Sequence, residues 1–156
     1  MKKNSEKDDL LFKLLEENLN ALNKAREILQ YSMKKCLPQV IKSANEVELE
    51  SCEALTARFA RAADILTQKV LKTIFLLLKE NPLTFIDKCN TAEKFGIIRS
   101  ADVLLSVRDL RNKIAHEYFL ENITDLFNDV AKFSGILCEI IDDVNNYART
   151  LLKKLG

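Results

Sequence analysis

Residues 124–151 read TDLFNDVAKFSGILCEIIDDVNNYARTL, and apolar side chains recur there at every third or fourth position. This spacing is that of one face of an amphipathic α-helix, because an α-helix turns by about 100° per residue. We therefore expect a long helix that begins at Asn122 or Thr124 and turns this face toward the core. The residues of the face are Leu126, Val130, Phe133, Leu137, Ile140, Val144, Ala148 and Leu151.

The same spacing predicts two long helices in the first half of the chain. The first covers about residues 8–35, and Pro38 marks the break after it, because proline is not tolerated in a helix interior. The second covers about residues 47–79 and is stopped by Asn81-Pro82. The expected core residues are Leu11, Leu14, Leu15, Leu22, Ala25, Ile28 and Leu29 in the first helix, and Leu55, Phe59, Ala62, Leu66, Val70, Thr73 and Leu77 in the second.

Two further helices are expected before residue 122. A short one covers Thr84 to Phe95 and is closed by Gly96, a residue that favours helix C-termini. Another main helix begins at Ser100-Ala101-Asp102, where a hydroxyl or carboxylate can cap the first free N–H groups. Its expected core face consists of Val103, Val107, Leu110 and Ile114.

These helices predict the fold class. The chain has only 3 glycines and 2 prolines in 156 residues, which favours long helices with short connections. No stretch alternates between apolar and polar residues for long enough to predict a strand. We therefore expect an all-α protein in which four helices form an antiparallel bundle, with one short extra helix, as a single domain over residues 1–156.

The composition limits how the chain could bind nucleic acids, metals or cofactors. The net charge is +1 and tryptophan is absent, so RNA contacts must come from a local patch, and an aromatic stacking platform is not expected. Cys36, Cys52, Cys89 and Cys138 are dispersed, and with a single histidine they do not indicate zinc or any other metal or cofactor. We expect them to be small apolar core residues in a reducing compartment.

We expect no signal for export or membrane insertion in this chain. Residues 1–9 are charged and have no apolar stretch of the signal-peptide kind, and the longest apolar run, Ile74 to Leu78, is too short to span a bilayer. We therefore expect a cytoplasmic protein that does not bind membranes.

The single histidine, His116, follows Arg111 by five positions. Histidine can move protons near neutral pH and arginine can neutralise a phosphate, so this pair can in principle cut RNA without a metal. On a regular helix His116 and Asn112 point away from the core, and Arg111 lies about 140° from His116. We therefore expect that the helix ends near Ala115 and that a second chain completes the site. The alternative is a solvated histidine or a favourable charge at a helix end.

Other charged residues carry weaker signals. Arg61 and Asp64 have the i,i+3 spacing of an ordinary surface ion pair, and we expect them to form one. Arg108 lies one turn before Arg111, where it can help to hold phosphate or simply lie on the surface.

The octet RNKIAHEY, residues 111–118, fits the pattern R-x4-H-x-Y with a polar residue directly after the arginine. It lies late in an expected helix of an all-helical chain. In these features the protein resembles the HEPN superfamily and, within it, the HepT-like toxins, which pair with a minimal nucleotidyltransferase antitoxin. The octet is the specific part of the resemblance, and the helical layout extends it in outline over most of the chain.

The resemblance implies a function and partners. Arg111 and His116 match the residues that such proteins use for metal-independent RNA cleavage, and Asn112 matches the polar position beside the arginine. Tyr118 matches the tyrosine to which the antitoxin transfers AMP. Proteins of this kind are usually homodimers whose paired motifs face a shared cleft.

Three interpretations stay open. The first is the ribonuclease that the resemblance implies. In the second, the chain is a non-catalytic partner or substrate-binding subunit of a nucleotidyltransferase, and Asn112, His116 and Tyr118 form a docking surface. In the third, it is a helical interaction module in which the octet is a coincidence. Tyr118 can equally be a half-buried aromatic side chain that packs beside Phe119.

Overall fold

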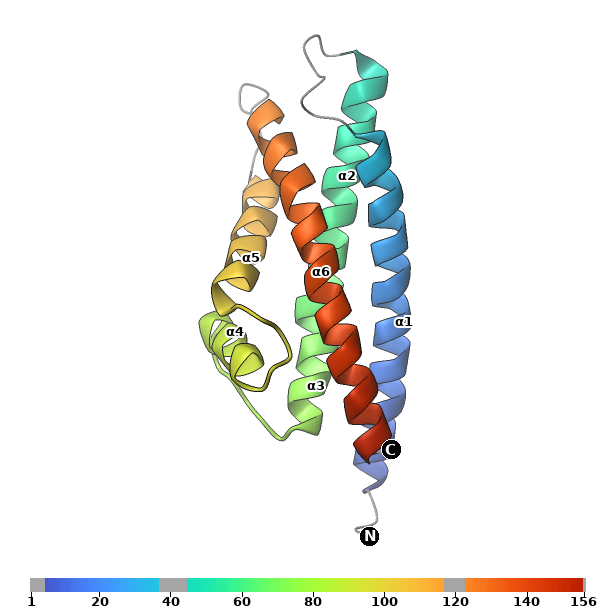
Figure 1. Cartoon of the computed structure of the whole chain (residues 1–156), viewed down its shortest axis with the longest axis vertical. Coiled ribbons are helices and arrows are strands. Elements are labelled where there is room, and N and C mark those ends of the chain that lie inside the picture. The colour runs from blue at the N-terminus through green and yellow to red at the C-terminus, as the bar shows by residue number, and fades with distance from the viewer. Residues whose placement is uncertain (1–4, 37–44, 117–122, 156) are drawn as a thin grey trace.

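The computed structural model describes residues 5–36, 45–116 and 123–155, and these residues form an all-helical protein with no strand among them (Figure 1). None of the helices in these ranges is both long and apolar enough to cross a membrane. The elements in chain order are α1 (Glu6–Lys35), α2 (Glu46–Asp64), the π-helical segment η2 (Ile65–Val70), α3 (Leu71–Leu77), α4 (Phe85–Lys94), α5 (Ala101–His116) and α6 (Ile123–Leu155).

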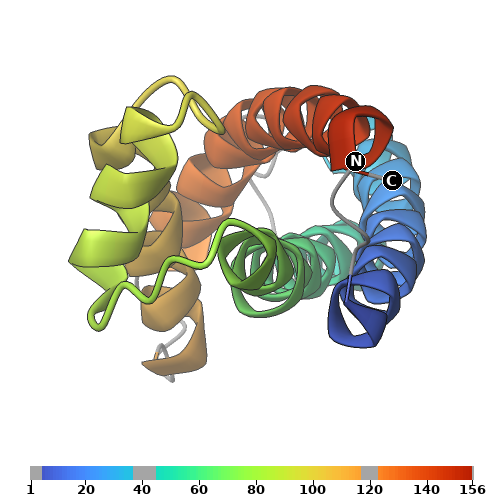
Figure 2. The same ribbon diagram turned by 90° about the horizontal axis from the view of Figure 1, so that it is seen from below.

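The long helices lie side by side around one hydrophobic core. α1, α6 and the continuous helix made of α2, η2 and α3 follow the long axis of the molecule, and Figure 2 shows them grouped around that axis. α5 packs on both α2 and α6, and α4 packs on α5 outside this group. Successive long helices run in opposite directions (Figure 1). This arrangement brings α5 alongside the end of α2.

The predicted helix over residues 47–79 is confirmed as one continuous run, with a change of helix type in its middle. Ile65–Val70 form a π-helix between α2 and α3. Every expected core residue of this helix, from Leu55 to Leu77, is buried. π-Helical turns inside α-helices are rare and often occur at functional sites. Asp64 directly precedes this one, at the surface that faces α5.

The first and last helices also follow the predicted patterns, with small differences. α1 is capped by Ser5, whose hydroxyl accepts a hydrogen bond from the Asp8 N–H at 3.2 Å. Leu14 was expected in the core but is 42% exposed, because it lies about 80° from the centre of the buried face. Pro38 lies outside the described residues. α6 begins at Ile123, and its expected core residues are buried except Phe133, which is half-buried.

The short helix and α5 begin and end where the capping residues predict. Thr84 forms a capping box with Asp87 at the start of α4, and Gly96 follows its C-terminal end with a φ of 71°. The Ser100 hydroxyl accepts a hydrogen bond from the Val103 N–H at the start of α5. The predicted core face of α5 needs a correction. Leu104 is fully buried, whereas Val103 is exposed. The buried face is thus turned by about 30° toward Arg111.

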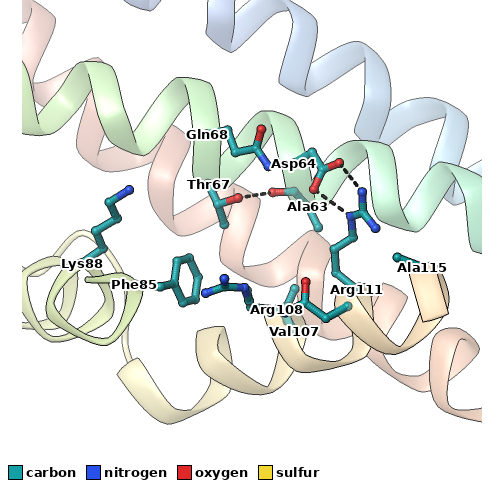
Figure 3. A pocket seen from close by; sticks show the side chains of 11 residues that line it. Ala63, Asp64, Thr67, Gln68, Phe85, Lys88, Val107, Arg108, Arg111 and Ala115 are labelled. Atoms are coloured by element: carbon teal, nitrogen blue, oxygen red, sulfur yellow. Dashed lines mark hydrogen bonds and ion pairs between the residues drawn. The ribbon is translucent and has the colours of Figure 1, made fainter. Parts of the chain in front are cut away.

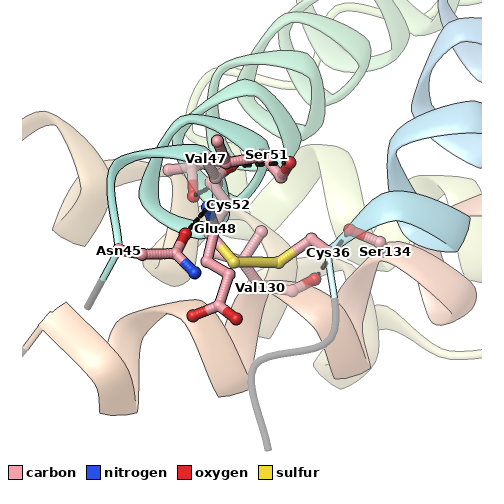
Figure 4. The surroundings of a disulfide bond; sticks show 9 residues. Cys36, Asn45, Val47, Glu48, Ser51, Cys52, Val130 and Ser134 are labelled. Carbon is pink, nitrogen blue, oxygen red and sulfur yellow. Dashed lines mark hydrogen bonds between the residues drawn. A yellow bond between two sulfur atoms is a disulfide. The ribbon is translucent and has the colours of Figure 1, made fainter. Parts of the chain in front are cut away.

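The expectation of four unpaired cysteines is wrong for two of them. Cys36, which caps the end of α1, forms a disulfide with Cys52 near the start of α2 (Figure 4). Both side chains are buried, and so are the free thiols of Cys89 and Cys138. The pairing depends on where α2 begins relative to the end of α1, which apolar spacing does not report. Because disulfides persist mainly in oxidising environments, the cysteines no longer support a reducing compartment.

Candidate functional site

A pocket of about 480 Å³ lies where α5 and α4 face the junction of α2 and η2 (Figure 3). α5 contributes two arginines and an asparagine, α4 contributes a lysine and a phenylalanine, and the junction contributes polar side chains. The polar and charged residues of its lining are Asp64, Thr67, Gln68, Lys88, Arg108, Arg111 and Asn112. The pocket therefore unites residues from three separate parts of the chain.

Arg111 is held in this pocket by Asp64. Its Nε donates to Oδ1 of Asp64 at 2.9 Å and its Nη2 donates to Oδ2 at 3.0 Å, which is the bidentate geometry of a strong charged pair (Figure 3). These hydrogen bonds raise the pKa of the Arg111 guanidinium, so the side chain stays charged. The expected surface pair between Arg61 and Asp64 is corrected, because α5 lies close enough to α2 for Asp64 to pair with Arg111 instead.

The other two cations of the pocket carry no carboxylate partner among the described residues. Arg108 stacks its guanidinium over the Phe85 ring, 4.4 Å from the ring centroid. Lys88 extends from α4 toward the helix that carries Gln68 (Figure 3). With Arg111 they give three positive charges against the single negative charge of Asp64. The pocket is therefore electropositive in a chain that is nearly neutral, and it suits an anion.

The helix junction shapes the opposite wall of the pocket. Thr67 and Gln68 belong to the π-helical segment, and the Thr67 hydroxyl donates to the Ala63 carbonyl at 2.9 Å (Figure 3). This hydrogen bond uses the hydroxyl hydrogen of Thr67. Gln68 is exposed, and its amide can both donate and accept hydrogen bonds. A bound anion would thus face the cations of α4 and α5 on one side, and on the other the amide of Gln68 and the Asp64 carboxylate that is paired with Arg111.

The structure brings together three of the five residues singled out from the sequence. Arg108, Arg111 and Asn112 all line the pocket. His116 is exposed, so it is not a core histidine, but it does not belong to the lining. Tyr118 lies outside the described residues. Arg108 and Arg111 are both half-buried.

The relation between Arg111 and His116 follows from the course of α5. The helix is regular as far as His116, one residue beyond the end expected near Ala115. The two side chains therefore differ by about 140° around the helix axis, and His116 lies about 40° past Asn112. Within one chain the guanidinium and the imidazole do not share a face. The second chain that would complete the site stays a prediction.

Several pocket residues give no signal in the sequence. Asp64 was noticed only for its neighbour Arg61, and Phe85, Lys88 and Gln68 belong to no motif. They belong to the site only because the fold brings α4 and the junction of α2 and η2 to the pocket beside α5. Within the part of the chain that the structure describes, no group of three or more His, Cys, Asp or Glu side chains could hold a metal ion.

The site can be compared with known proteins only through the octet. No protein-family model, no curated protein and no solved structure matches the chain. The resemblance to the HEPN superfamily therefore rests on residues 111–118 in a helical context, and the activity, the partner and the modification that it implies are proposals.

Proposed function

We propose that this protein is a metal-independent endoribonuclease of the HEPN superfamily and, within it, a HepT-like toxin. In this proposal its long helices form a HEPN-like antiparallel four-helix bundle, with α4 as the extra helix. The observation that carries the proposal is the electropositive pocket that gathers Arg108, Arg111 and Asn112 within the two helical turns before the exposed His116. A phosphodiester is an anion of a kind that such a pocket favours.

The proposed reaction is cleavage by the RNA's own ribose. The 2′ oxygen forms a bond to the phosphorus of its 3′ phosphate, while the bond from phosphorus to the 5′ oxygen of the next nucleotide breaks. The products are a 2′,3′-cyclic phosphate and a free 5′-hydroxyl. One imidazole accepts the 2′ proton and another gives a proton to the leaving 5′ oxygen, which typically accelerates such reactions by about 10²–10⁴-fold.

Arg111 would stabilise the negative charge that gathers on the phosphate oxygens. Its Nε and one hydrogen of Nη2 are used by Asp64, which leaves the other side of the guanidinium for the substrate. Asp64 thereby fixes the plane of the guanidinium before the substrate arrives, and a prepositioned charge is more effective than a mobile one. Arg108 and Asn112 would complete the phosphate contacts.

The proposal requires two copies of the chain. Each chain has a single histidine, while the reaction needs a general base and a general acid. A two-fold homodimer supplies two imidazoles to one cleft. The angle of about 140° between Arg111 and His116 supports the same arrangement, because the histidine can then serve a phosphate held by the arginine of the other subunit.

Tyr118 would be the regulated residue. In the proposal a minimal nucleotidyltransferase antitoxin transfers AMP to its hydroxyl, so that the oxygen of Tyr118 forms a phosphodiester with AMP and pyrophosphate leaves ATP. The added group is bulky and anionic, and it lies two positions from His116. It would repel the substrate phosphate and fill the cleft. Mass spectrometry after co-expression with the antitoxin tests this step, and an unmodified tyrosine would contradict it.

The nuclease proposal is tested by RNA cleavage in EDTA. We expect the wild-type protein to produce 2′,3′-cyclic ends, and His116→Ala and Arg111→Ala to lose this activity. Lys113→Ala is the matched control, because Lys113 is exposed on the same helix and does not line the pocket. Equal activity of the wild type and His116→Ala would rule out the mechanism.

A second candidate function is favoured by one observation. Asn112 and His116 are exposed, and His116 is not part of the pocket lining. The pair can therefore be part of a docking surface for a nucleotidyltransferase in a non-catalytic subunit. Growth after expression separates the two functions. Toxicity that is lost in Arg111→Ala supports the nuclease, whereas harmless expression with binding that is lost in His116→Ala supports the docking subunit.

A further inference from the structure

A second pocket of about 400 Å³ adjoins the first one. It lies between η2, α3, α4 and the segment 78–84 that joins the last two. Gln68 and Lys88 line both pockets, so the two adjoin at these residues, and we call the two pockets together the groove. The remaining lining residues of the second pocket are Lys72, Phe75, Leu76, Glu80, Asn81 and Pro82.

The positive charge of the first pocket continues into the second. Lys72 is exposed, lies four positions after Gln68, and forms no salt bridge among the described residues. Lys88 stands between the pockets, and Glu80 is the one acidic residue of the second lining. The whole groove thus carries the cations Lys72, Lys88, Arg108 and Arg111 against the carboxylates Asp64 and Glu80. One of these carboxylates is already bound to Arg111.

We propose that this groove binds the strand of a single-stranded RNA beyond the bond that is cut, with Lys88 and Lys72 contacting the next phosphates along the backbone. The inference rests on the proposed nuclease function, because it assigns the scissile phosphate to Arg111. A row of cations along a groove is how proteins follow a single-stranded backbone. Gln68 and Asn81 supply the amides that can hydrogen-bond to base edges of an unpaired strand.

The assignment to nucleic acid follows from the proposed nuclease, because the second pocket adjoins the one assigned to the scissile phosphate. The amides of Gln68 and Asn81 and the apolar surface of Leu76 and Pro82 can contact the bases of a bound strand. A protein that is nearly neutral overall attracts RNA only where its cations are gathered. The two adjoining pockets of this groove gather four of them.

The test measures binding separately from cleavage. A 2′-O-methyl oligouridine about ten nucleotides long cannot be cut, because its 2′ oxygen is blocked, and it is long enough to fill the groove. We expect Lys72→Ala to weaken its binding by about three- to tenfold, and to reduce the slope of log K against log salt by about 0.7, the value for one phosphate contact to a single strand. Lys69→Ala is the control, since Lys69 is exposed on η2 but lines neither pocket.

The outcomes separate this inference from the nuclease proposal. If unmodified RNA is cut, but Lys72→Ala and Lys69→Ala bind the oligonucleotide alike, the groove assignment is wrong and the nuclease stands. If RNA is not cut, but Lys72→Ala alone weakens binding, the groove binds RNA and the nuclease proposal fails. An oligoglutamate that binds as tightly as the oligouridine, with the same loss in Lys72→Ala, would overturn the assignment to RNA.

Discussion

Asp64 and Arg111 lie 47 positions apart in the chain, and their side chains meet through two parallel hydrogen bonds of 2.9 and 3.0 Å. The pair joins the last residue of α2 to the half of α5 that contains the octet. Both side chains are about one-third exposed, at 33% and 30%, so the pair contributes little to stability but fixes where the guanidinium points. In the proposed nuclease Asp64 is therefore a positioning residue.

Asp64→Asn should separate positioning from binding. The amide keeps the size of the side chain but loses the charge and one of the two accepting oxygens, so Arg111 is held less firmly. We expect kcat for RNA cleavage to fall by about 10²-fold, which is the typical loss of rate when a catalytic group is misplaced by about 1 Å. KM should stay the same or fall, because the pocket loses its one negative charge.

The control for this prediction is Asp109→Asn, which removes an exposed carboxylate from α5 that does not line the pocket. Asp64→Glu should recover part of kcat, because it keeps the charge. A purely structural role for Asp64 would instead lower the melting temperature and leave kcat of the folded protein unchanged. Equal kcat values for Asp64→Asn and Asp109→Asn would contradict the positioning role.

A mixture of wild-type and His116→Ala chains tests the shared cleft. A mixed dimer has only one histidine, so it cannot supply both the general base and the general acid of the proposed reaction. If one cleft needs both imidazoles, random mixing of equal amounts should leave about a quarter of the wild-type activity, since only a quarter of the dimers then carry two histidines. Cleavage assays after co-refolding measure this.

A different result is expected from the mixing experiment if the two subunits act independently. If each subunit cleaves RNA with only its own Arg111 and His116, half of the active sites stay intact and the mixture keeps about half of the wild-type activity. The regular course of α5 as far as His116 favours the first outcome, because it keeps the two side chains on different faces.

The features that follow from local spacing were predictable from the sequence. The core stripe from Leu55 to Leu77 is buried at every expected position, even across the π-helical segment, because burial there repeats with the helix period. Thr84 and Ser100 begin their helices as capping chemistry predicts. Leu14 and Val103 were misassigned because apolar residues at the edge of a stripe look the same in sequence as those at its centre.

The features that depend on how distant elements meet were not predictable. In the sequence, Asp64 follows Arg61 by three positions, which predicts an ion pair between them. Asp64 pairs with Arg111 instead, because α5 packs against α2. Cys36 and Cys52 pair for the same reason, since α2 packs against α1. Three of the seven polar and charged residues of the pocket, Arg108, Arg111 and Asn112, were thus found from one helix, whereas the other four required the fold.

The thiol of Cys89 should make stability depend on pH in the alkaline range. Cys89 is fully buried, and burial raises the pKa of its thiol from 9.0 to about 11, because a thiolate in the core loses its hydration. The folded state then keeps a proton that the unfolded chain has lost. The free energy of unfolding is therefore unaffected below pH 9.0 and falls as the pH rises from 9.0 to about 11.

Urea titrations of the wild type and Cys89→Ala at a series of pH values measure this effect. The wild type should lose as much as about 3 kcal/mol more than the variant across the alkaline window. The cavity left by the substitution lowers the stability of the variant by a constant amount, so only the difference in slope is informative. Parallel curves for the two proteins would show that the Cys89 thiol does not contribute.

The disulfide between Cys36 and Cys52 should stabilise the protein without affecting the pocket. It closes a loop with a sequence separation of 16, for which the loss of chain entropy in the unfolded state corresponds to about 3 kcal/mol. We expect a reductant to lower the free energy of unfolding by about this amount. Cys36→Ala/Cys52→Ala should have the lower stability from the outset and should not respond to the reductant.

Counting thiols tests the bond itself. Alkylation in denaturant without reductant should label the two free cysteines, Cys89 and Cys138, and reduction beforehand should raise the number to four. Because the bond lies near the start of α2 and Asp64 at its end, RNA cleavage well below the melting temperature should be the same with and without reductant. Four labelled thiols before reduction would show that the bond does not form, and a loss of cleavage in folded, reduced protein would show that it reaches the pocket.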